Sequence, residues 1–320
     1  MNKLTLAIPS KGRLQEQTLD YLSDAGMRLL QTRGARDYTA KLTGVEDVSV
    51  ALLSAAEIAD ELIAGRIHFG VTGEDLLAEH NANQRAIVIE RLGFGGANVV
   101  VAVPRSWIDV SSMTDLDDVA AEFHARHRRK MRVATKFINL ARRFFETHGI
   151  ADYRIIESLG ATEGAPAAGT AEVIVDITTT GATLTANELK ILDDGTILES
   201  EASLVASTGA DWTTDARNTA RALLDRISAR VKAKSSQILE FASSISTPAL
   251  LEKLCKEFGA EVLSSATSES TSLLVPDKQL SSIVALLRQH APATSLATHK
   301  PNQVFGSANV LFEKLTRALS

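Results

Sequence analysis

Residues 173–177 form an apolar, mostly β-branched run, Val-Ile-Val-Asp-Ile, in which one acid, Asp176, interrupts the pattern. Such a run predicts a parallel strand that is buried on both faces of a sheet. Four threonines and one glycine follow within residues 178–183, and a helix-forming segment begins near Ala186. Because ligands gather where the strands of an open α/β sheet end, the pattern predicts a site directly after Asp176.

Strand and helix patterns alternate over residues 1–234, which predicts an α/β fold. After residue 235 the order becomes strand, helix, strand, strand, helix, strand, which is the ferredoxin-like pattern. The predicted strands are 3–8, 48–53, 67–71, 98–103, 131–134, 173–177 and 204–205, followed by 237–243, 260–265, 272–275 and 294–299. The predicted helices include 14–25, 55–64, 213–234, 248–258, 278–290 and 308–319.

Composition places the chain among ordinary globular proteins. It has 320 residues, 45% hydrophobic and 23% charged, enough for two or three domains. A formal net charge of -5 argues against nucleic acid or an anionic membrane as the main partner. The single cysteine, Cys255, excludes an intrachain disulfide and a thiolate zinc cluster. Because we find no signal-peptide core and no membrane-spanning apolar run, we expect a cytoplasmic protein.

The turn after Asp176 has the composition of a phosphate-binding loop. Its residues are Thr178, Thr179, Thr180, Gly181, Ala182 and Thr183. Hydroxyls and backbone N–H groups at the start of a helix bind phosphate well, because the helix N-terminus adds partial positive charge. The carboxylate of Asp176 is suited to ribose hydroxyls or to Mg²⁺, which prefers oxygen ligands. The same composition also fits a turn that only caps the helix.

Three further loops follow predicted strands and carry charged side chains. They contain Lys11 and Arg13 after the first strand, Gly73, Glu74 and Asp75 after the third, and Lys136 after the fifth. The basic residues are suited to a polyphosphate or nucleotide, and they also fit plain surface charge. The two acids either orient a ribose or a metal ion or occupy the first turn of a helix.

The stretch from Glu163 to Leu184 resembles the signature of ATP phosphoribosyltransferase, the enzyme that opens histidine biosynthesis. The positions that carry the resemblance are Glu163, Gly169, Ala171, Ile174, Asp176, Thr180, Gly181, Thr183 and Leu184. Three other segments look like the same family, namely SKGRL from Ser10, GVTGEDLL from Gly70 and ATKFINLARR from Ala134.

The resemblance implies that N1 of the ATP adenine displaces diphosphate from C1 of 5-phosphoribosyl 1-diphosphate, with inversion and with Mg²⁺ as cofactor. The implied ligands of 5-phosphoribosyl 1-diphosphate are Glu163, Asp176 and residues 178–183, and those of ATP or the diphosphate are Lys11, Arg13, Gly73, Glu74, Asp75 and Lys136. Asp176, Arg13 and Lys11 are the candidate catalytic residues, since preorganised charges can stabilise the departing diphosphate. Asp176 is also the candidate Mg²⁺ ligand.

The family's fold implies two α/β lobes like those of periplasmic binding proteins, with the active site in the cleft between them. Residues 1–97 and 187–230 would form lobe I, and residues 98–186 would form lobe II. Residues 235–320 would form a ferredoxin-like domain of the regulatory type, which in the family's long form binds histidine as a feedback inhibitor. The helix predicted over 308–319 departs from the strand that the family suggests there. Family members assemble as dimers or hexamers, so we expect a homo-oligomer.

One segment departs from the family. Where arginines and acids commonly precede an Ile-Pro or Val-Pro step, this chain has LLSAAEIA, with Ser54 in place of a guanidinium suited to the diphosphate. Arg33, Arg36 or Lys41 are candidate substitutes. Two α/β lobes also fit a non-catalytic protein that binds small ligands, and the phosphate-binding loop also fits a phosphoribosyltransferase acting on another base. The lack of a signal peptide disfavours a transport role, and the three additional matching segments disfavour another base.

Overall fold

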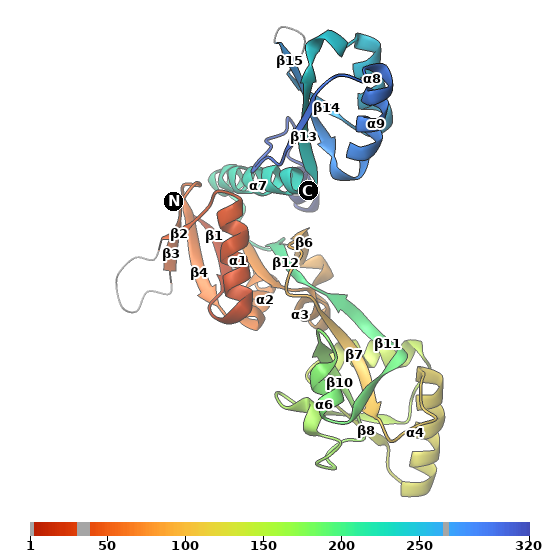
Figure 1. The fold of residues 1–320 in the computed structure, drawn as a ribbon. Helices are drawn as coiled ribbons and strands as arrows, with labels where there is room; N and C mark the ends of the chain where they lie inside the picture. Colours follow the sequence, from red (N-terminus) through yellow and green to blue (C-terminus); the bar gives the residue numbers. More distant parts are fainter. Residues whose placement is uncertain (1–2, 31–38, 265–268) are drawn as a thin grey trace.

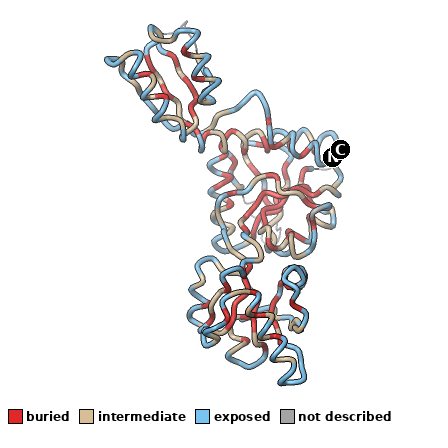
Figure 2. The backbone as a smooth tube through the Cα atoms, turned by 90° about the vertical axis from the view of Figure 1, so that its right-hand side faces the viewer, coloured by how far each residue is buried: buried red, intermediate tan, exposed pale blue. Residues whose placement is uncertain are grey.

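The computed structural model describes residues 3–30, 39–264 and 269–320, which form three bodies in a row (Figure 1). Lobe I lies in the middle, lobe II lies on one side of it, and a small C-terminal domain lies on the other. The tube drawn in Figure 2 places most buried residues inside each body rather than between bodies. None of the described helices has the length and apolar character needed to cross a membrane. Each body therefore has its own core.

Lobe I is built on a sheet with the strand order β2-β3-β4-β1-β5-β12-β6. Its strands are β1 (Leu4–Pro9), β2 (Leu29–Leu30), β3 (Thr39–Leu42), β4 (Val48–Leu53), β5 (Phe69–Gly73), β6 (Ala86–Arg91) and β12 (Ala202–Ser207). Its helices are α1 (Gly12–Asp24), α2 (Ala55–Ile63), α3 (Glu74–Glu79), η1 (Ala82–Gln84), α7 (Thr214–Lys234) and α10 (Val310–Ala318). Strands β4, β1 and β5 are parallel, so the loops that follow them share one edge of the sheet.

Helices cover both faces of this sheet. On one face, α1, α7 and α10 contribute Tyr21, Leu223 and Leu315 to a core that is built on β1 and β5. On the other face, α2 and α3 contribute Ile58 and Leu77. The buried side chains of α1, Thr18, Tyr21 and Leu22, lie three and four residues apart and form one buried stripe. The predicted α/β character of this part is confirmed.

Lobe II is built on a sheet with the order β11-β7-β10-β8-β9. Its strands are β7 (Ala97–Pro104), β8 (Met131–Thr135), β9 (Tyr153–Glu157), β10 (Val173–Thr178) and β11 (Leu189–Ser200). Its helices are α4 (Met113–His127), α5 (Ile138–Thr147), η2 (Thr162–Gly164) and α6 (Ala182–Ala186). Val173, Ile174 and Val175 are each 0% exposed, because β10 has packed side chains on both faces. The strand predicted from the β-branched run is confirmed.

The chain returns to lobe I later than predicted. Strand β11 pairs with β7 and therefore belongs to the sheet of lobe II, so the expected boundary at residue 187 is wrong. The return occurs between Ser200 and Ala202, where β11 ends and β12 begins. Strand β12 then pairs with β5 and β6 in lobe I. The two lobes are thus joined by two short crossings, one before β7 and one after β11.

The C-terminal domain has the strand order β14-β15-β13-β16, and all its pairs are antiparallel. Its elements are β13 (Ser236–Ala242), η3 (Ser243–Ile245), α8 (Pro248–Phe258), β14 (Glu261–Ser264), β15 (Ser270–Pro276), η4 (Asp277–Gln279), α9 (Leu280–His290) and β16 (Leu296–His299). Helices α8 and α9 pack on one face of the sheet through Leu254 and Ile283. The element order is the βαββαβ pattern that the sequence predicts.

The last helix does not belong to this small domain. Helix α10 returns to lobe I, where Leu311 and Leu315 lie in the core beside α7. Asn309 caps the helix by accepting from the N–H of Phe312 at 3.0 Å, and its side chain donates to the carbonyl of Arg221 in α7 at 3.1 Å. The predicted domain range of 235–320 is therefore too long at its C-terminal end. An amphipathic helix needs an apolar partner, and lobe I supplies it.

Substitution of Leu315 by alanine should destabilise lobe I. The side chain is 1% exposed, so the change leaves a cavity and should lower the free energy of unfolding by about 2–5 kcal/mol. Val310 lies on the same helix but is 66% exposed, and Val310→Ala should change it by less than about 0.5 kcal/mol. Urea unfolding followed by circular dichroism measures both. Equal effects of the two substitutions would show that α10 is not docked as described.

Candidate active site

Two parallel strands of lobe II bring charged residues together at one edge of the sheet. Strands β8 and β10 are neighbours, with Thr135 opposite Val175. The residues that follow this pair, Lys136 and Asp176, therefore emerge side by side where β8 and β10 approach their ends. Lys136 is exposed and Asp176 is half-buried. The sequence predicts a site after each of these strands, and the sheet places the two predicted positions side by side.

Electrostatics link Asp176 to two other predicted residues. Burial raises the pKa of Asp176 above its usual value, and the nearby charge of Glu163 raises it further. The hydrogen bond from the N–H of Ile177, at 2.8 Å, and the positive charge of Lys136 act in the opposite direction. Lys136, Glu163 and Asp176 thus form one charged cluster. A cluster in which burial leaves a carboxylate incompletely compensated is typical of a functional site.

The threonine-rich turn follows this cluster directly. The hydroxyl of Thr178 accepts from the N–H of Gly181 at 2.9 Å, and Gly181 has a φ of 74°, which a glycine adopts without strain. Thr179, Thr180 and Thr183 are exposed, and the Thr180 hydroxyl accepts from the N–H of Ala182 at 3.4 Å. Helix α6 begins at Ala182, four residues before the predicted start, which places its N-terminus at the turn itself. The turn therefore fits both a helix cap and a phosphate-binding loop.

A basic loop lies at the corresponding edge of lobe I. Lys11 is the N-cap residue of α1, and the N–H of Ser10 donates to the carbonyl of Leu53 at 2.8 Å, which fixes the loop against β4. Lys11 and Arg13 are exposed, and neither pairs with another residue in the described part of the chain. This edge of lobe I faces lobe II in Figure 1. The two positive charges thus lie on the edge of lobe I that faces lobe II.

Glu74 is held within the protein, although sequence analysis predicted that it contacts a ligand. Its carboxylate makes a bidentate ion pair with Arg91, at 2.7 Å for each contact, and accepts from the hydroxyl of Ser203 at 2.8 Å. Arg91 ends β6 and Ser203 lies in β12, so Glu74 fastens α3 to the strands next to the lobe crossings. This arrangement describes a structural role, and a ligand contact by Glu74 stays a prediction.

Asp75 is likewise held within the protein. It is 6% exposed and accepts from the hydroxyl of Ser200 at 2.8 Å, while its own N–H donates to the same hydroxyl at 3.0 Å. A side chain at Gly73 would collide with Asp75, because a Cβ there would lie 2.2 Å from a carboxylate oxygen. Gly73 thus allows Asp75 to fold back onto the end of β11. Ligand contacts of both residues stay predictions.

Ser54, which replaces the family arginine, has a structural explanation. It is the N-cap of α2, and its side chain forms a capping box with Glu57: the serine hydroxyl accepts at 3.2 Å and the Glu57 carboxylate accepts from the N–H of Ser54 at 2.8 Å. Of the candidate substitutes for the arginine, Lys41 is an exposed residue of β3. Arg33 and Arg36 lie outside the described residues.

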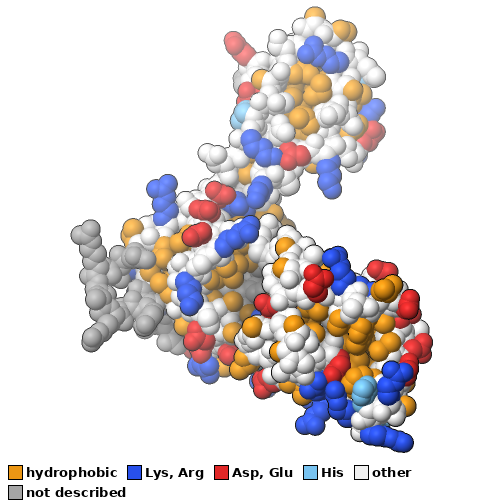
Figure 3. Space-filling model, turned by 60° about the horizontal axis from the view of Figure 1, so that its bottom comes forward, with side chains coloured by type: hydrophobic (Ala, Val, Ile, Leu, Met, Phe, Trp, Pro, Cys, Tyr) orange, Lys and Arg blue, Asp and Glu red, His pale blue; other side chains and the backbone are white. Residues whose placement is uncertain are grey.

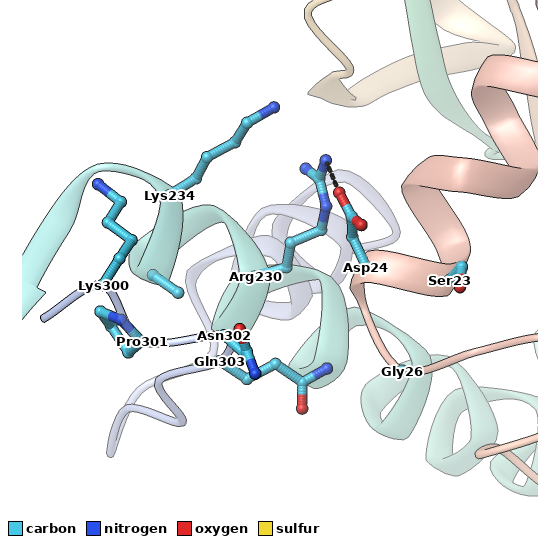
Figure 4. Close-up of a pocket in the computed structure, with 10 residues that line it drawn as sticks. Ser23, Asp24, Gly26, Arg230, Lys234, Lys300, Pro301, Asn302 and Gln303 are labelled. Atoms are coloured by element: carbon cyan, nitrogen blue, oxygen red, sulfur yellow. Dashed lines mark hydrogen bonds and ion pairs between the residues drawn. The ribbon is translucent and has the colours of Figure 1, made fainter.

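One cavity lies away from these residues. It has a volume of about 520 Å³ and opens between the end of α1, the end of α7 and the segment after β16 (Figure 4). Its lining residues are Ser23, Asp24, Gly26, Arg230, Ala233, Lys234, Lys300, Pro301, Asn302 and Gln303. Arg230 is ion-paired there with Asp24 at 3.0 Å. None of the predicted site residues lines this cavity.

Sequence analysis missed one residue near the site. Glu79, at the end of α3, accepts hydrogen bonds from the first backbone N–H groups of α5. The start of a helix in lobe II thus binds a carboxylate from lobe I. A glutamate at a helix end is common, so the sequence holds no signal for this contact.

Comparisons with known proteins agree with the resemblance in the sequence. The sequence model of the family described as "HisG: ATP phosphoribosyltransferase" matches residues 54–229. An ATP phosphoribosyltransferase of Nitrobacter winogradskyi is 52% identical over 316 residues, which cover 98% of this chain and 97% of the relative. One from Bradyrhizobium diazoefficiens is 52% identical over 314 residues, which cover 97% of this chain and 96% of the relative.

A solved structure supports the same conclusion. The chain from the structure titled "ATP phosphoribosyl transferase (HisG:HisZ) complex from Thermotoga maritima" aligns with a TM-score of 0.56 and 27% identity, covering 72% of this chain and 99% of that chain. Together with the full-length relatives, this match shows that the chain belongs to the family of ATP phosphoribosyltransferases, pentosyltransferases that act in histidine biosynthesis.

Proposed function

We propose that this chain joins ATP and 5-phosphoribosyl 1-diphosphate in the cleft between lobes I and II. N1 of adenine attacks C1 of the ribose, the bond from C1 to the diphosphate oxygen breaks, and the diphosphate leaves with the electron pair. The observation that carries this proposal is the convergence of Lys136, Glu163 and Asp176 beside the threonine-rich turn. No nucleophilic side chain is needed, because positioning and charge stabilisation suffice for such a displacement.

Each lobe would bind different parts of the two substrates. The exposed residues Thr179, Thr180 and Thr183 fit the 5-phosphate, because a helix begins at the turn. Asp176 fits the ribose hydroxyls. Lys11 and Arg13 on lobe I, with Lys136 on lobe II, fit the triphosphate of ATP or the departing diphosphate, whose negative charge grows in the transition state. Glu163 remains a proposed ligand of 5-phosphoribosyl 1-diphosphate, and residues 73–75 remain proposed ligands of ATP or the diphosphate.

Magnesium fits this site when it shares its ligands with substrate. No group of three or more His, Cys, Asp or Glu side chains in the described ranges could hold a metal ion alone. Mg²⁺ usually takes one or two carboxylates together with substrate phosphates, and Asp176 is a half-buried carboxylate beside the turn. When bound there, Mg²⁺ would neutralise charge on the diphosphate. Asp176 would orient the ion, and Lys136 would add a second positive charge.

The direct test is product formation by the purified chain. It should convert ATP and 5-phosphoribosyl 1-diphosphate to phosphoribosyl-ATP in the presence of Mg²⁺ and pyrophosphatase, as followed by ultraviolet absorbance. Ligand binding without product would favour the alternative of a non-catalytic binding protein. The Thermotoga relative was solved in a complex with HisZ. Because this chain carries an additional domain of its own, we propose that it is active as a homo-oligomer without a second protein, in the cytoplasm.

Asp176→Asn should separate activity from stability. The amide can still accept from Ile177, but it cannot carry charge to Mg²⁺ or ribose, so turnover should fall about 100-fold or more. Burial raises the pKa of Asp176, so the folded protein binds this proton more tightly than the unfolded chain does. Ionisation then costs stability as the pH rises through the raised pKa. At pH 7 the variant should therefore melt at the same or a higher temperature. Full activity would remove Asp176 from the site.

Lys136→Met should change the pH dependence. Its positive charge lowers the pKa of Asp176, so its removal should raise that pKa further. If ionised Asp176 is required, the acid limb of kcat/KM for 5-phosphoribosyl 1-diphosphate should move to higher pH. Lys130 is a matched control at the opposite end of β8, where its side chain donates to the carbonyl of Ala151 at 2.8 Å. An unshifted profile for Lys136→Met, or an equal shift for Lys130→Met, would contradict the charged cluster.

The C-terminal domain should carry any inhibition by histidine. Ile238 and His299 are paired neighbours in the sheet, so a short Gly-Ser linker can replace residues 238–299 while α7 and α10 stay in place. We expect this deletion variant to keep its activity and to lose the inhibition by histidine that the full chain shows in the same assay. A variant that is still inhibited would place the histidine site in the lobes. Plain truncation before Ser236 is a poor test, because it also removes α10 from lobe I.

A further inference from the structure

The angle between the lobes depends on few connections. One crossing leads from β6 to β7 and the other from β11 to β12. Figure 2 shows a narrow waist between the lobes, and Figure 3 shows a narrow neck between lobe I and the C-terminal domain. Bodies joined in this way move relative to each other unless specific contacts hold them. The contacts across the waist therefore decide how the two halves of the active site face each other.

Glu79 of lobe I binds the start of a helix in lobe II. One carboxylate oxygen accepts from the N–H of Asn139 at 2.8 Å, and the other accepts from the N–H of Asn139 at 3.1 Å and of Leu140 at 2.9 Å. The first N–H groups of a helix have no partner inside the helix, and they carry partial positive charge. Phe137, the N-cap residue of α5, offers no capping side chain. Glu79 thus caps α5 from the opposite lobe.

The contact is reciprocal. Arg143, one turn along α5, donates to the carbonyl of Ala78 near the end of α3 at 2.6 Å. The side-chain amide of Asn139 donates to the carbonyl of Glu79 at 3.1 Å. Cations and donors stabilise the C-terminal end of a helix, which carries partial negative charge. Each helix end therefore receives a partner of opposite charge from the other lobe, while Ala78 packs against the apolar core of lobe II.

We propose that Glu79 is a positioning residue, which caps α5 and so holds the two lobes at the angle required for the reaction. The contact of its carboxylate with the N–H groups of Asn139 and Leu140 is called the clasp below. The same helix α3 begins at Glu74, which is fixed to β6 and β12 beside the crossings. Helix α3 thus connects the hinge at one end with lobe II at the other. The proposal rests on the proposed function, because it assumes that residues of both lobes bind the substrates. Glu79 itself touches no substrate.

Loss of the clasp should appear in KM rather than in kcat. Without it, the substrate-free lobes sample more orientations, and each substrate must select the productive one. Glu79→Ala should therefore raise KM for ATP and for 5-phosphoribosyl 1-diphosphate by a common factor, about fivefold or more. The value of kcat should change little, because bound substrates restore the orientation. Glu79→Gln keeps the shape of the side chain but loses its charge, so its KM values should lie between those of Glu79→Ala and those of the parent protein.

Fluorescence energy transfer tests the same idea without activity. Asp20 on α1 and Ala121 on α4 are exposed, so dyes on Asp20→Cys and Ala121→Cys report the distance between the lobes in a Cys255→Ala background. Adding Glu79→Ala should broaden the distance distribution of the substrate-free protein. Glu146 is the matched control: it is exposed on α5, and its side chain makes no hydrogen bond or ion pair with the described residues. Glu146→Ala should change neither readout.

The outcomes separate the possible failures. An unchanged distance distribution, a fall in KM, or a loss of kcat at constant KM would each overturn the clasp, the last because it indicates only a smaller folded fraction. An inactive parent protein would instead refute the proposed function, and the distance measurement would still test the contact. Arg143→Met removes the reciprocal hydrogen bond, and it should shift both KM values in the same direction by a smaller factor.

Discussion

Burial of β10 between β7 and β8 is the constraint on which the candidate site depends. Val173 and Val175 pack into one core of lobe II and Ile174 packs into the other. Because both faces are filled, a shift of register would expose or misplace every one of these side chains. The observed register sets Thr135 opposite Val175. Lys136 and Asp176 are neighbours for this reason alone, and the threonine-rich turn takes its place from the same strand.

Two acids near the ends of β10 show how the protein treats buried charge. Burial would raise the pKa of Glu172, but hydrogen bonds and charge from Arg132 and Arg129 lower it to about 2. That carboxylate is fully compensated within the protein and serves structure. Asp176 receives one backbone N–H and the more distant charge of Lys136, so its pKa stays raised. Incomplete compensation costs folding stability, and it leaves a carboxylate ready for an ion or for hydroxyl groups that a ligand brings.

Local patterns predicted the elements well where burial requires a regular pattern of apolar residues. Examples are the β-branched run of β10 and the βαββαβ order after residue 235. They failed where the partner lies elsewhere in the chain. Strand β11 carries an Asp-Asp-Gly interruption and pairs with β7 through register shifts, so nothing local assigns it to lobe II. Helix α10 reads as amphipathic, but its pattern does not say which core receives it. The contact of Glu79 with the other lobe is recognisable only once the position of α5 in space is known. The family resemblance supplied the lobes, and the sheets supplied the side-by-side placement of Lys136 and Asp176.

The C-terminal domain is inserted between two helices that both pack on lobe I, so any movement of it acts on that pair. Asn309 joins the start of α10 to Arg221 of α7, and Arg230 of α7 stacks on the ring of Tyr21 in α1 at 3.8 Å. Helix α1 begins at the loop of Lys11. A contiguous packed route thus runs from the small domain through α7 and α1 to the basic edge of the cleft. Coupling between distant sites needs such a route together with an element that has two arrangements. The waist between the lobes allows a second arrangement, because each lobe keeps its own core when the angle changes.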